Sequence, residues 1–181
     1  MKQKENLYTT VKLALLISLI ILSSYIYIPM PSVSVLSLQT VAINLTALML
    51  SPFQSFTAVG TWLIMGAIGL PVFSGGGGLG KLSGITGGFY WGFLIAAPVM
   101  SALKGKNISF KRYLTVTLAG LLIEHFFAVI VMCVHNGFDI PAAFSSISLP
   151  FLAGDVLKCI ASALLAEKLN SLKILKDRHR L

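Results

Sequence analysis

Apolar residues run along this chain in six blocks, which are separated by proline, by glycine or by clusters of charge. A helix that crosses a membrane needs about 20 mostly apolar residues, with a range of about 17–25. Most of the blocks approach that length, although the second is short for a complete span. We therefore predict six transmembrane helices, at Val11–Ile28, Leu38–Leu50, Phe56–Leu70, Ile85–Leu103, Tyr113–Val134 and Pro150–Leu169.

Composition supports the membrane interpretation. Of the 181 residues, 56% are hydrophobic and only 11% are charged, whereas about a quarter of the residues of a soluble domain are charged. The length corresponds to one domain, so the apolar excess does not belong to an anchor attached to a soluble body. We expect an all-α integral membrane protein in which residues 1–181 form a single transmembrane domain surrounded by the lipid bilayer.

Positive charge is distributed unevenly between the two sides that six spans would create. Cytoplasmic loops are enriched in lysine and arginine, and with an even number of spans both termini share a side with the connection at residues 104–112. Only Lys81 lies on the opposite side. We therefore expect both termini in the cytoplasm. The twelve cytoplasmic positive residues are Lys2, Lys4, Lys12, Lys104, Lys106, Lys111, Arg112, Lys168, Lys173, Lys176, Arg178 and Arg180.

The longer connections fall on the outer side: Pro29–Ser37, Val72–Gly84 and His135–Leu149. Long connections without secondary structure of their own are often lids or binding loops, so we expect the binding side to be outside. Within them, residues 75–80 are almost all glycine. This segment is either a flexible lid over an outer pocket or a passive turn.

Ionisable side chains within a membrane are costly, and each is therefore a candidate functional residue. Asp155 and Lys158 are three positions apart, so they share one face of the last helix and can pair. Counted from a helix start near Phe151, Asp155 would lie only about 6–8 Å into the helix, close to the outer mouth. The pair is either a structural salt bridge or a donor and an acceptor for a polar solute.

Glu124 and His125 lie near the middle of the fifth predicted helix. Adjacent helical residues point about 100° apart, so we do not expect both to face one partner. Each could form an interhelical hydrogen bond, contact a partner protein, contact a ligand or belong to a proton relay.

Several other functions are disfavoured by the sequence. The net charge of +8 comes from short clusters rather than from a continuous basic face, so we expect no nucleic-acid binding. The glycine-rich segment lacks the Gly-Lys-Ser/Thr ending of a phosphate-binding loop, which leaves the chain without an ATP site of its own. We find no catalytic or metal-ligand spacing, expect no bound cofactor, and interpret Cys133 and Cys159 as core residues. We therefore expect a binding protein rather than an enzyme.

Four motifs occur in a fixed order along nearly the whole chain, and together they resemble the BioY family, the biotin-binding S components of energy-coupling-factor (ECF) vitamin transporters. The first motif is Leu38-Gln39-Thr40, and the second runs from Gly66 through Pro71 to Phe73. The third is Thr86-Gly87-Gly88-Phe89, followed by Gly92-Phe93. The fourth joins Leu149-Pro150-Phe151 to Gly154-Asp155 and Lys158.

The resemblance implies a six-helix S component that captures biotin from outside and works with a transmembrane T subunit and two ATPase subunits in the cytoplasmic membrane. It implies that Asp155 and Lys158 bind the vitamin. The glycine loop here lacks polar residues that some relatives carry, so Lys81 or Tyr90 is the candidate for holding the carboxylate of biotin. The expected substrate-binding residues are Asp155, Lys158, Gln39, Tyr90, Gly77, Lys81 and Phe151. The alternatives are an S component for another small vitamin, or a passive facilitator for small solutes.

Overall fold

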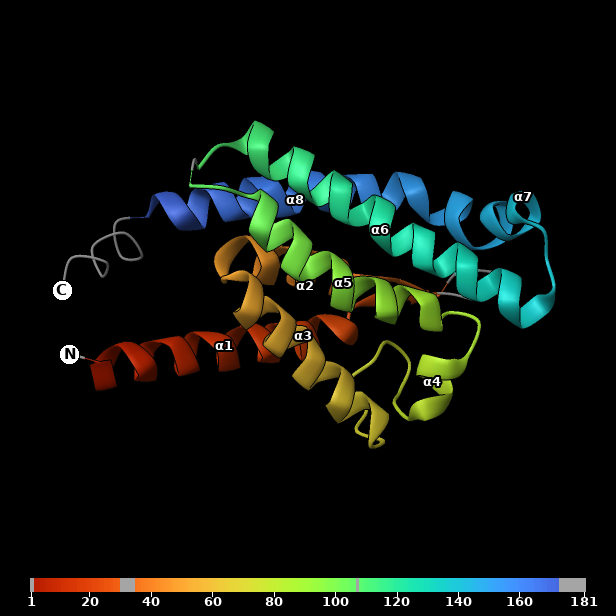
Figure 1. Cartoon of the computed structure of the whole chain (residues 1–181), viewed down its shortest axis with the longest axis horizontal. Helices are drawn as coiled ribbons and strands as arrows, with labels where there is room; N and C mark the ends of the chain where they lie inside the picture. Colours follow the sequence, from red (N-terminus) through yellow and green to blue (C-terminus); the bar gives the residue numbers. More distant parts are fainter. Residues whose placement is uncertain (1, 30–34, 107, 173–181) are drawn as a thin grey trace.

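The computed structural model describes residues 2–29, 35–106 and 108–172, and it shows a bundle of helices (Figure 1). Its six longer helices are α1 (Lys2–Ser24), α2 (Gln39–Met49), α3 (Pro52–Ala67), α5 (Gly87–Leu103), α6 (Phe110–Asn136) and α8 (Leu149–Ser171). Its shorter elements are β1 (Tyr27–Pro29), β2 (Val35–Ser37), α4 (Leu79–Ser83), α7 (Ile140–Ala143) and the π-helix η1 (Phe144–Ser148). Each predicted helix overlaps one of the six longer helices. The predicted all-helical fold is confirmed, with one short antiparallel pair of strands added.

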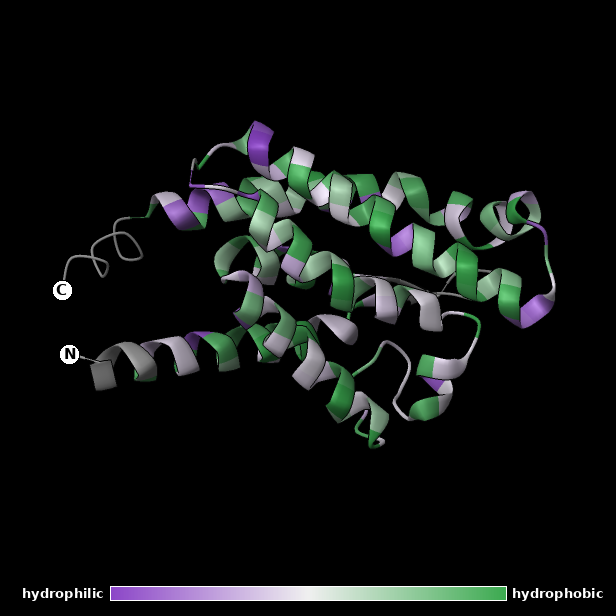
Figure 2. Cartoon of the chain, in the orientation of Figure 1, coloured by the Kyte–Doolittle hydropathy of each residue, from purple (hydrophilic) through white to green (hydrophobic). Residues whose placement is uncertain are grey.

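Hydrophobic residues predominate along the helices, as the colouring in Figure 2 shows, and many large hydrophobic side chains are exposed on the bundle. Leu122 and Val134 on α6 are 71% and 81% exposed, which suits contact with lipid and not with water. Three helical stretches of the described residues are long and apolar enough to cross a membrane: Leu7–Ser24, Phe110–Asn136 and Ile140–Ser171. The helices α2 and α5 are shorter and also apolar.

Most helix boundaries differ from the sequence prediction by a few residues, and α1 begins at Lys2, nine residues before the predicted start. Two further differences change the type of a segment. Tyr27 and Ile28, expected at the end of the first helix, belong to strand β1. The expected loop over His135–Leu149 is mostly helical, because helix resumes at Ile140. Asp139 caps this helix by accepting a hydrogen bond from the backbone N–H of Ala142 at 2.9 Å, as an N-cap residue does.

Pro150 explains why the sequence suggested a helix start at this point. Proline has no N–H to donate to the preceding turn, and in the structure the π-helical turn η1 lies immediately before α8 and keeps the chain helical there. Counted from Leu149, where α8 begins, Asp155 lies six residues, or about 9 Å, into this helix at 1.5 Å per residue. The shorter helical elements α7 and η1 precede that start, and Asp155 is 7% exposed.

Positively charged side chains hold the C-terminal end of the short helix α2. Lys12 Nζ donates to the carbonyl of Met49 at 2.7 Å, and Lys104 Nζ donates to the carbonyls of Ala47 and Leu50. These carbonyls have no partner within the helix, and cations are favourable at this end of the helix dipole. Burial and the charge of Lys12 lower the pKa of Lys104 to about 8. The other end of α2, where Gln39 lies, faces the candidate site.

Close packing of α5 against α6 depends on two glycines of the third motif. A Cβ atom on Gly88 would lie 2.4 Å from the carbonyl oxygen of Phe127, and one on Gly92 would lie 2.7 Å from the Cα atom of Glu124. Both distances are too short for a side chain. Glycine at these positions therefore lets the two backbones approach, as small residues do in membrane helix pairs, and it sets the position of α6 beside the site.

Candidate binding site

A cavity lies between α2, α5, α8 and the segment that connects α3 to α5. It contains about 640 Å³ of space that no atom occupies, including its open mouth. Its lining combines hydroxyl groups, four aromatic rings and three charged side chains. The lining residues are Ser37, Gln39, Thr40, Ser74, Lys81, Thr86, Phe89, Tyr90, Phe93, Phe151, Asp155 and Lys158.

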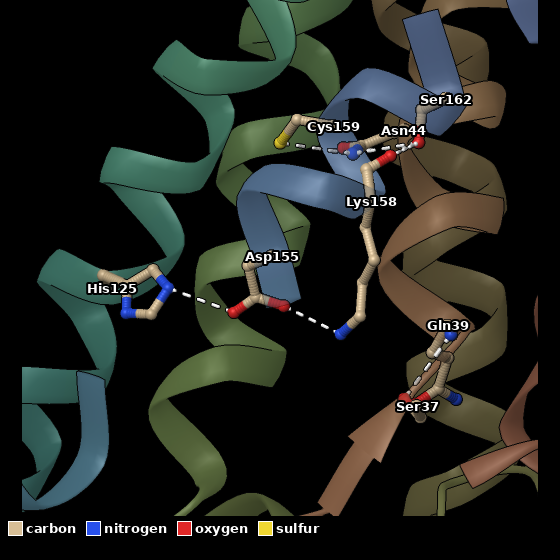
Figure 3. A network of polar contacts seen from close by, with 8 residues as sticks. All are labelled: Ser37, Gln39, Asn44, His125, Asp155, Lys158, Cys159 and Ser162. Carbon is tan, nitrogen blue, oxygen red and sulfur yellow. Dashed lines mark hydrogen bonds and ion pairs between the residues drawn. The ribbon is translucent and has the colours of Figure 1, made fainter. Parts of the chain in front are cut away.

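Asp155 and Lys158 form the predicted pair on α8. Lys158 Nζ donates to Asp155 Oδ1 at 2.7 Å, and both side chains are about nine-tenths buried. The second oxygen of Asp155, Oδ2, lies 3.2 Å from Nε2 of His125 on α6. Figure 3 shows the carboxylate between the imidazole on one side and the ammonium on the other. Both of its oxygens are therefore held, and its orientation toward the cavity is fixed.

Aromatic side chains make the apolar part of the wall. Phe89 and Phe151 have ring centroids 6.4 Å apart with their planes at 76°, an edge-to-face contact that stabilises ring pairs. Phe89 also packs edge-on against the ring of His125 at 5.5 Å. The ring of Tyr90 lies 4.5 Å from that of Phe73, with the two planes tilted by 40°. The cavity thus offers a ligand flat apolar surfaces next to one charged pair.

The side chain of Gln39 ties the loop after α3 to the start of α2. Its Nε2 donates to the carbonyl of Val72 at 3.2 Å, and its Oε1 accepts a hydrogen bond from the hydroxyl of Ser74 at 3.1 Å. The indole of Trp62 donates to the same Val72 carbonyl at 2.9 Å. Gln39 therefore borders the cavity with its amide already hydrogen-bonded, and it holds the loop in place.

Lys81 reaches the cavity from the short helix α4. Its Nζ donates to the carbonyl of Ser74 at 3.4 Å. The structure's described residues contain no carboxylate within salt-bridge distance of Lys81, since their two ion pairs involve only His125, Lys158 and Asp155. The cavity thus contains one paired ammonium and one that is free to meet an anion.

The glycine loop before α4 has a backbone that only glycine adopts easily. Gly75, Gly76 and Gly78 have φ angles of 79°, 129° and 99°, in the region that disfavours other residues. A Cβ atom on Gly77 would lie 2.1 Å from the carbonyl oxygen of Leu70, so this glycine packs against the loop's own backbone. Of the seven predicted site residues, six line the cavity, and Gly77 does not.

The sequence missed several lining residues and one important partner. Thr40, Thr86, Phe89 and Phe93 lie within the motifs quoted above, which was the available signal. His125 was noticed as a buried ionisable residue, and the interhelical hydrogen bond considered for it is present, to Asp155. Nothing in the local spacing links two residues that are 30 positions apart.

A multi-pass helical bundle with a buried, partly charged and partly aromatic cavity defines the class of this molecule as a membrane protein with a site suited to a small solute. The model of the BioY family matches residues 1–174. This chain belongs to the BioY family. Membership agrees with the expectation of a transport protein and not an enzyme.

Individual relatives support the assignment. The chain is 36% identical over 167 residues to the biotin transporter BioY of Thermotoga maritima, which covers 91% of this chain and 96% of the relative. It is 34% identical over 135 residues to a probable biotin transporter BioY of Pyrococcus horikoshii, covering 74% and 79% of the two chains. The crystal structure of an S component for biotin from an ECF-type ABC transporter matches with a TM-score of 0.85 over 94% of both chains. At 23% identity, that likeness shows the fold.

Proposed function

We propose that this chain is the biotin-binding S component of an ECF transporter. In this role it captures biotin at the outer face of the cytoplasmic membrane, and a T subunit with two ATPase subunits supplies the energy. The observation that carries the proposal is the Asp155–Lys158 pair, held in a cavity with aromatic walls in a chain of the BioY family.

The chemistry of biotin suits this cavity at three points. Its ureido head has two N–H donors and one carbonyl acceptor, which the Asp155 carboxylate and the Lys158 ammonium can match in opposite senses. Its fused rings and aliphatic chain are apolar, as are Phe89 and Phe151 in the wall. Its carboxylate needs a cation, and Lys81 is the ammonium without a carboxylate partner among the described residues.

Orientation also belongs to this proposal. The start of α1, the end of α8 and the connection between α5 and α6 lie at the same end of the bundle in Figure 1. The positive-inside rule assigns that end to the cytoplasm. The cavity, which is bordered by the connection between α3 and α5, then opens toward the outside.

The test is titration calorimetry of the detergent-purified chain with biotin, thiamine and lipoate, together with two variants. Asp155→Asn keeps the shape but loses the charge, and Lys158→Met keeps the stem but loses the donor. Hydrogen bonds to charged groups contribute about 1.5–3 kcal/mol, so we expect each variant to bind biotin about 10-fold to 150-fold more weakly with near-normal thermal melting. Depressed melting with wild-type affinity would identify the pair as a structural salt bridge. Tighter binding of thiamine or lipoate would reassign the vitamin.

A further inference from the structure

Glu124 is a buried carboxyl group that the proposed ligand contacts do not use. It lies near the middle of α6, is 2% exposed, and its Oε1 atom has no hydrogen-bond partner. Its backbone packs directly against Gly92 of α5. Its carboxyl interacts electrostatically with Asp155 and Lys158 on α8. A carboxylate in this position would be expensive unless a cation paired with it.

No side chain supplies that cation. Within the described ranges, no lysine, arginine or histidine nitrogen lies within salt-bridge distance of Glu124. The ammonium of Lys158 is bonded to Asp155 at 2.7 Å, and His125 is bonded to the same carboxylate. Both side chains are thus already bonded to Asp155.

A second unpaired acceptor lies in the same part of the bundle. Asn44 on α2 is 1% exposed, and its Nδ2 donates to Ser162 Oγ at 3.4 Å and lies 4.0 Å from Cys159 Sγ. Its Oδ1 has no donor. Cys159 also interacts electrostatically with Glu124. Figure 3 shows Cys159 and Ser162 on α8 beyond the Asp155–Lys158 pair, with the amide of Asn44 from α2 beside them. In this cluster, two buried oxygen atoms, Glu124 Oε1 and Asn44 Oδ1, therefore have no donor among the described residues.

A proton on Glu124 supplies what this cluster lacks. A protonated carboxyl group has one O–H donor and no charge, so it removes the buried charge and adds a donor where Oε1 and Asn44 Oδ1 have none. We propose that Glu124 is a proton-binding site beneath the ligand cavity, and that the bound proton leaves the cavity with a net charge of +1 for a monoanionic ligand.

The charge balance follows from the titratable groups around the cavity. Asp155 contributes −1, whereas Lys158 and Lys81 contribute +1 each, so the sum is +1 when Glu124 is neutral. An ionised Glu124 would bring the sum to zero, and a bound monocarboxylate would then leave an excess negative charge in the bundle. The other titratable groups on the helices packed around Glu124 near the cavity are His125, Cys159 and Tyr90, and this sum counts only the carboxyl groups and the lysines. The inference rests on the proposed function only in taking the ligand to be a monoanion.

Infrared difference spectroscopy tests the proton directly, without any ligand. Wild type at neutral pH should show the carbonyl stretch of a buried protonated carboxylic acid. Glu124→Gln should lose this band, and Asp155→Asn should keep it. If wild type shows no such band, or if the band disappears only in Asp155→Asn, the proposal is overturned. If Glu124→Gln folds poorly, the wild-type spectrum still tests the proposal, because absence of the band in wild type overturns it.

Calorimetry tests the consequence for binding. Glu124→Gln mimics the protonated acid, so it should bind biotin within about threefold of wild type at neutral pH. Raising the pH until Glu124 ionises should weaken binding to wild type by on the order of tenfold, the effect of one like charge about 10 Å away at an effective dielectric constant of about 20. Glu124→Gln should not show this tenfold weakening. It should still share any loss of affinity that comes from the lysines at high pH. Equal pH profiles would refute the coupling. Absence of biotin binding in wild type would instead count against the proposed function and leave the infrared result intact.

Discussion

Nε2 of His125 on α6 lies 3.2 Å from Oδ2 of Asp155 on α8, although 30 positions separate the two residues. Lys158 occupies the other oxygen of the same carboxylate. His125 does not itself line the cavity, but its ring also supports Phe89, which does. The histidine therefore acts on the site through two residues that it positions.

Replacing His125 tests this positioning role. His125→Phe keeps a flat ring against Phe89 but removes the hydrogen bond to Asp155, so we expect biotin to bind about tenfold more weakly. Thr115→Val, which removes a side-chain hydrogen bond on the exposed face of the same helix, serves as the control and should bind normally. Calorimetry and thermal melting of both variants are the measurements. A lower melting temperature of His125→Phe with unchanged biotin affinity would show that the histidine only stabilises the fold.

The sequence was sufficient to predict the helices and the local pair. The six apolar blocks predicted the six longer helices, because membrane spans need long apolar runs. Asp155 and Lys158 were expected to meet because residues three apart share a helix face. The contact between His125 and Asp155 depends on how α6 packs against α8, and a single sequence contains no local signal for such packing.

Two features in the surroundings of a helix could not be predicted. Glu124 and His125 point about 100° apart, and of the two only His125 bonds Asp155 among the described residues. Both are nevertheless buried, because α6 is covered by α5 on one side and by α8 on another. The helix through residues 140–148 was missed because a π-helical turn compensates for Pro150. Neither effect is visible in hydrophobic periodicity.

Ser109 provides a test of orientation. It caps the start of α6 by accepting a hydrogen bond from the N–H of Arg112 at 3.3 Å, at the end of the bundle that we assign to the cytoplasm. A cysteine introduced by Ser109→Cys in a chain with Cys133 and Cys159 replaced should react with a membrane-permeant maleimide only. Phe138→Cys, in the connection at the opposite end, is the matched control and should react with an impermeant reagent in intact cells. Labelling of Ser109→Cys by the impermeant reagent would reverse the orientation.

The glycine loop should become more ordered when biotin binds. Residues 75–80 combine high backbone freedom with attachment near the cavity through Ser74, whose hydroxyl is bonded to Gln39. We expect biotin to slow amide hydrogen exchange in this segment. Gly80→Ala, where an added Cβ meets no atom within 4 Å, should preserve binding. Gly78→Ala, at a φ of 99° and a ψ of 158°, should weaken binding through backbone strain of about 1–3 kcal/mol. Equal hydrogen exchange with and without biotin would show that the segment is a passive turn.

Lys81 should determine whether the ligand needs a free carboxylate. Its ammonium borders the cavity and contacts only a backbone carbonyl among the described contacts, that of Ser74, so an arriving anion has no bound carboxylate to displace. Lys81→Met keeps the aliphatic stem and removes the charge. We expect it to weaken binding of biotin by about 10-fold to 150-fold and to leave binding of biotinamide, the neutral amide, nearly unchanged. Wild type should accordingly prefer biotin to biotinamide, whereas Lys81→Met should discriminate little between them.

Lys106→Met, an exposed change at the other end of the bundle, controls for the loss of one positive charge from the chain. Calorimetry with the two ligands and three proteins gives the complete comparison. If Lys81→Met weakened biotin and biotinamide equally, the lysine would contribute to the shape of the cavity, and the carboxylate would have to meet another group.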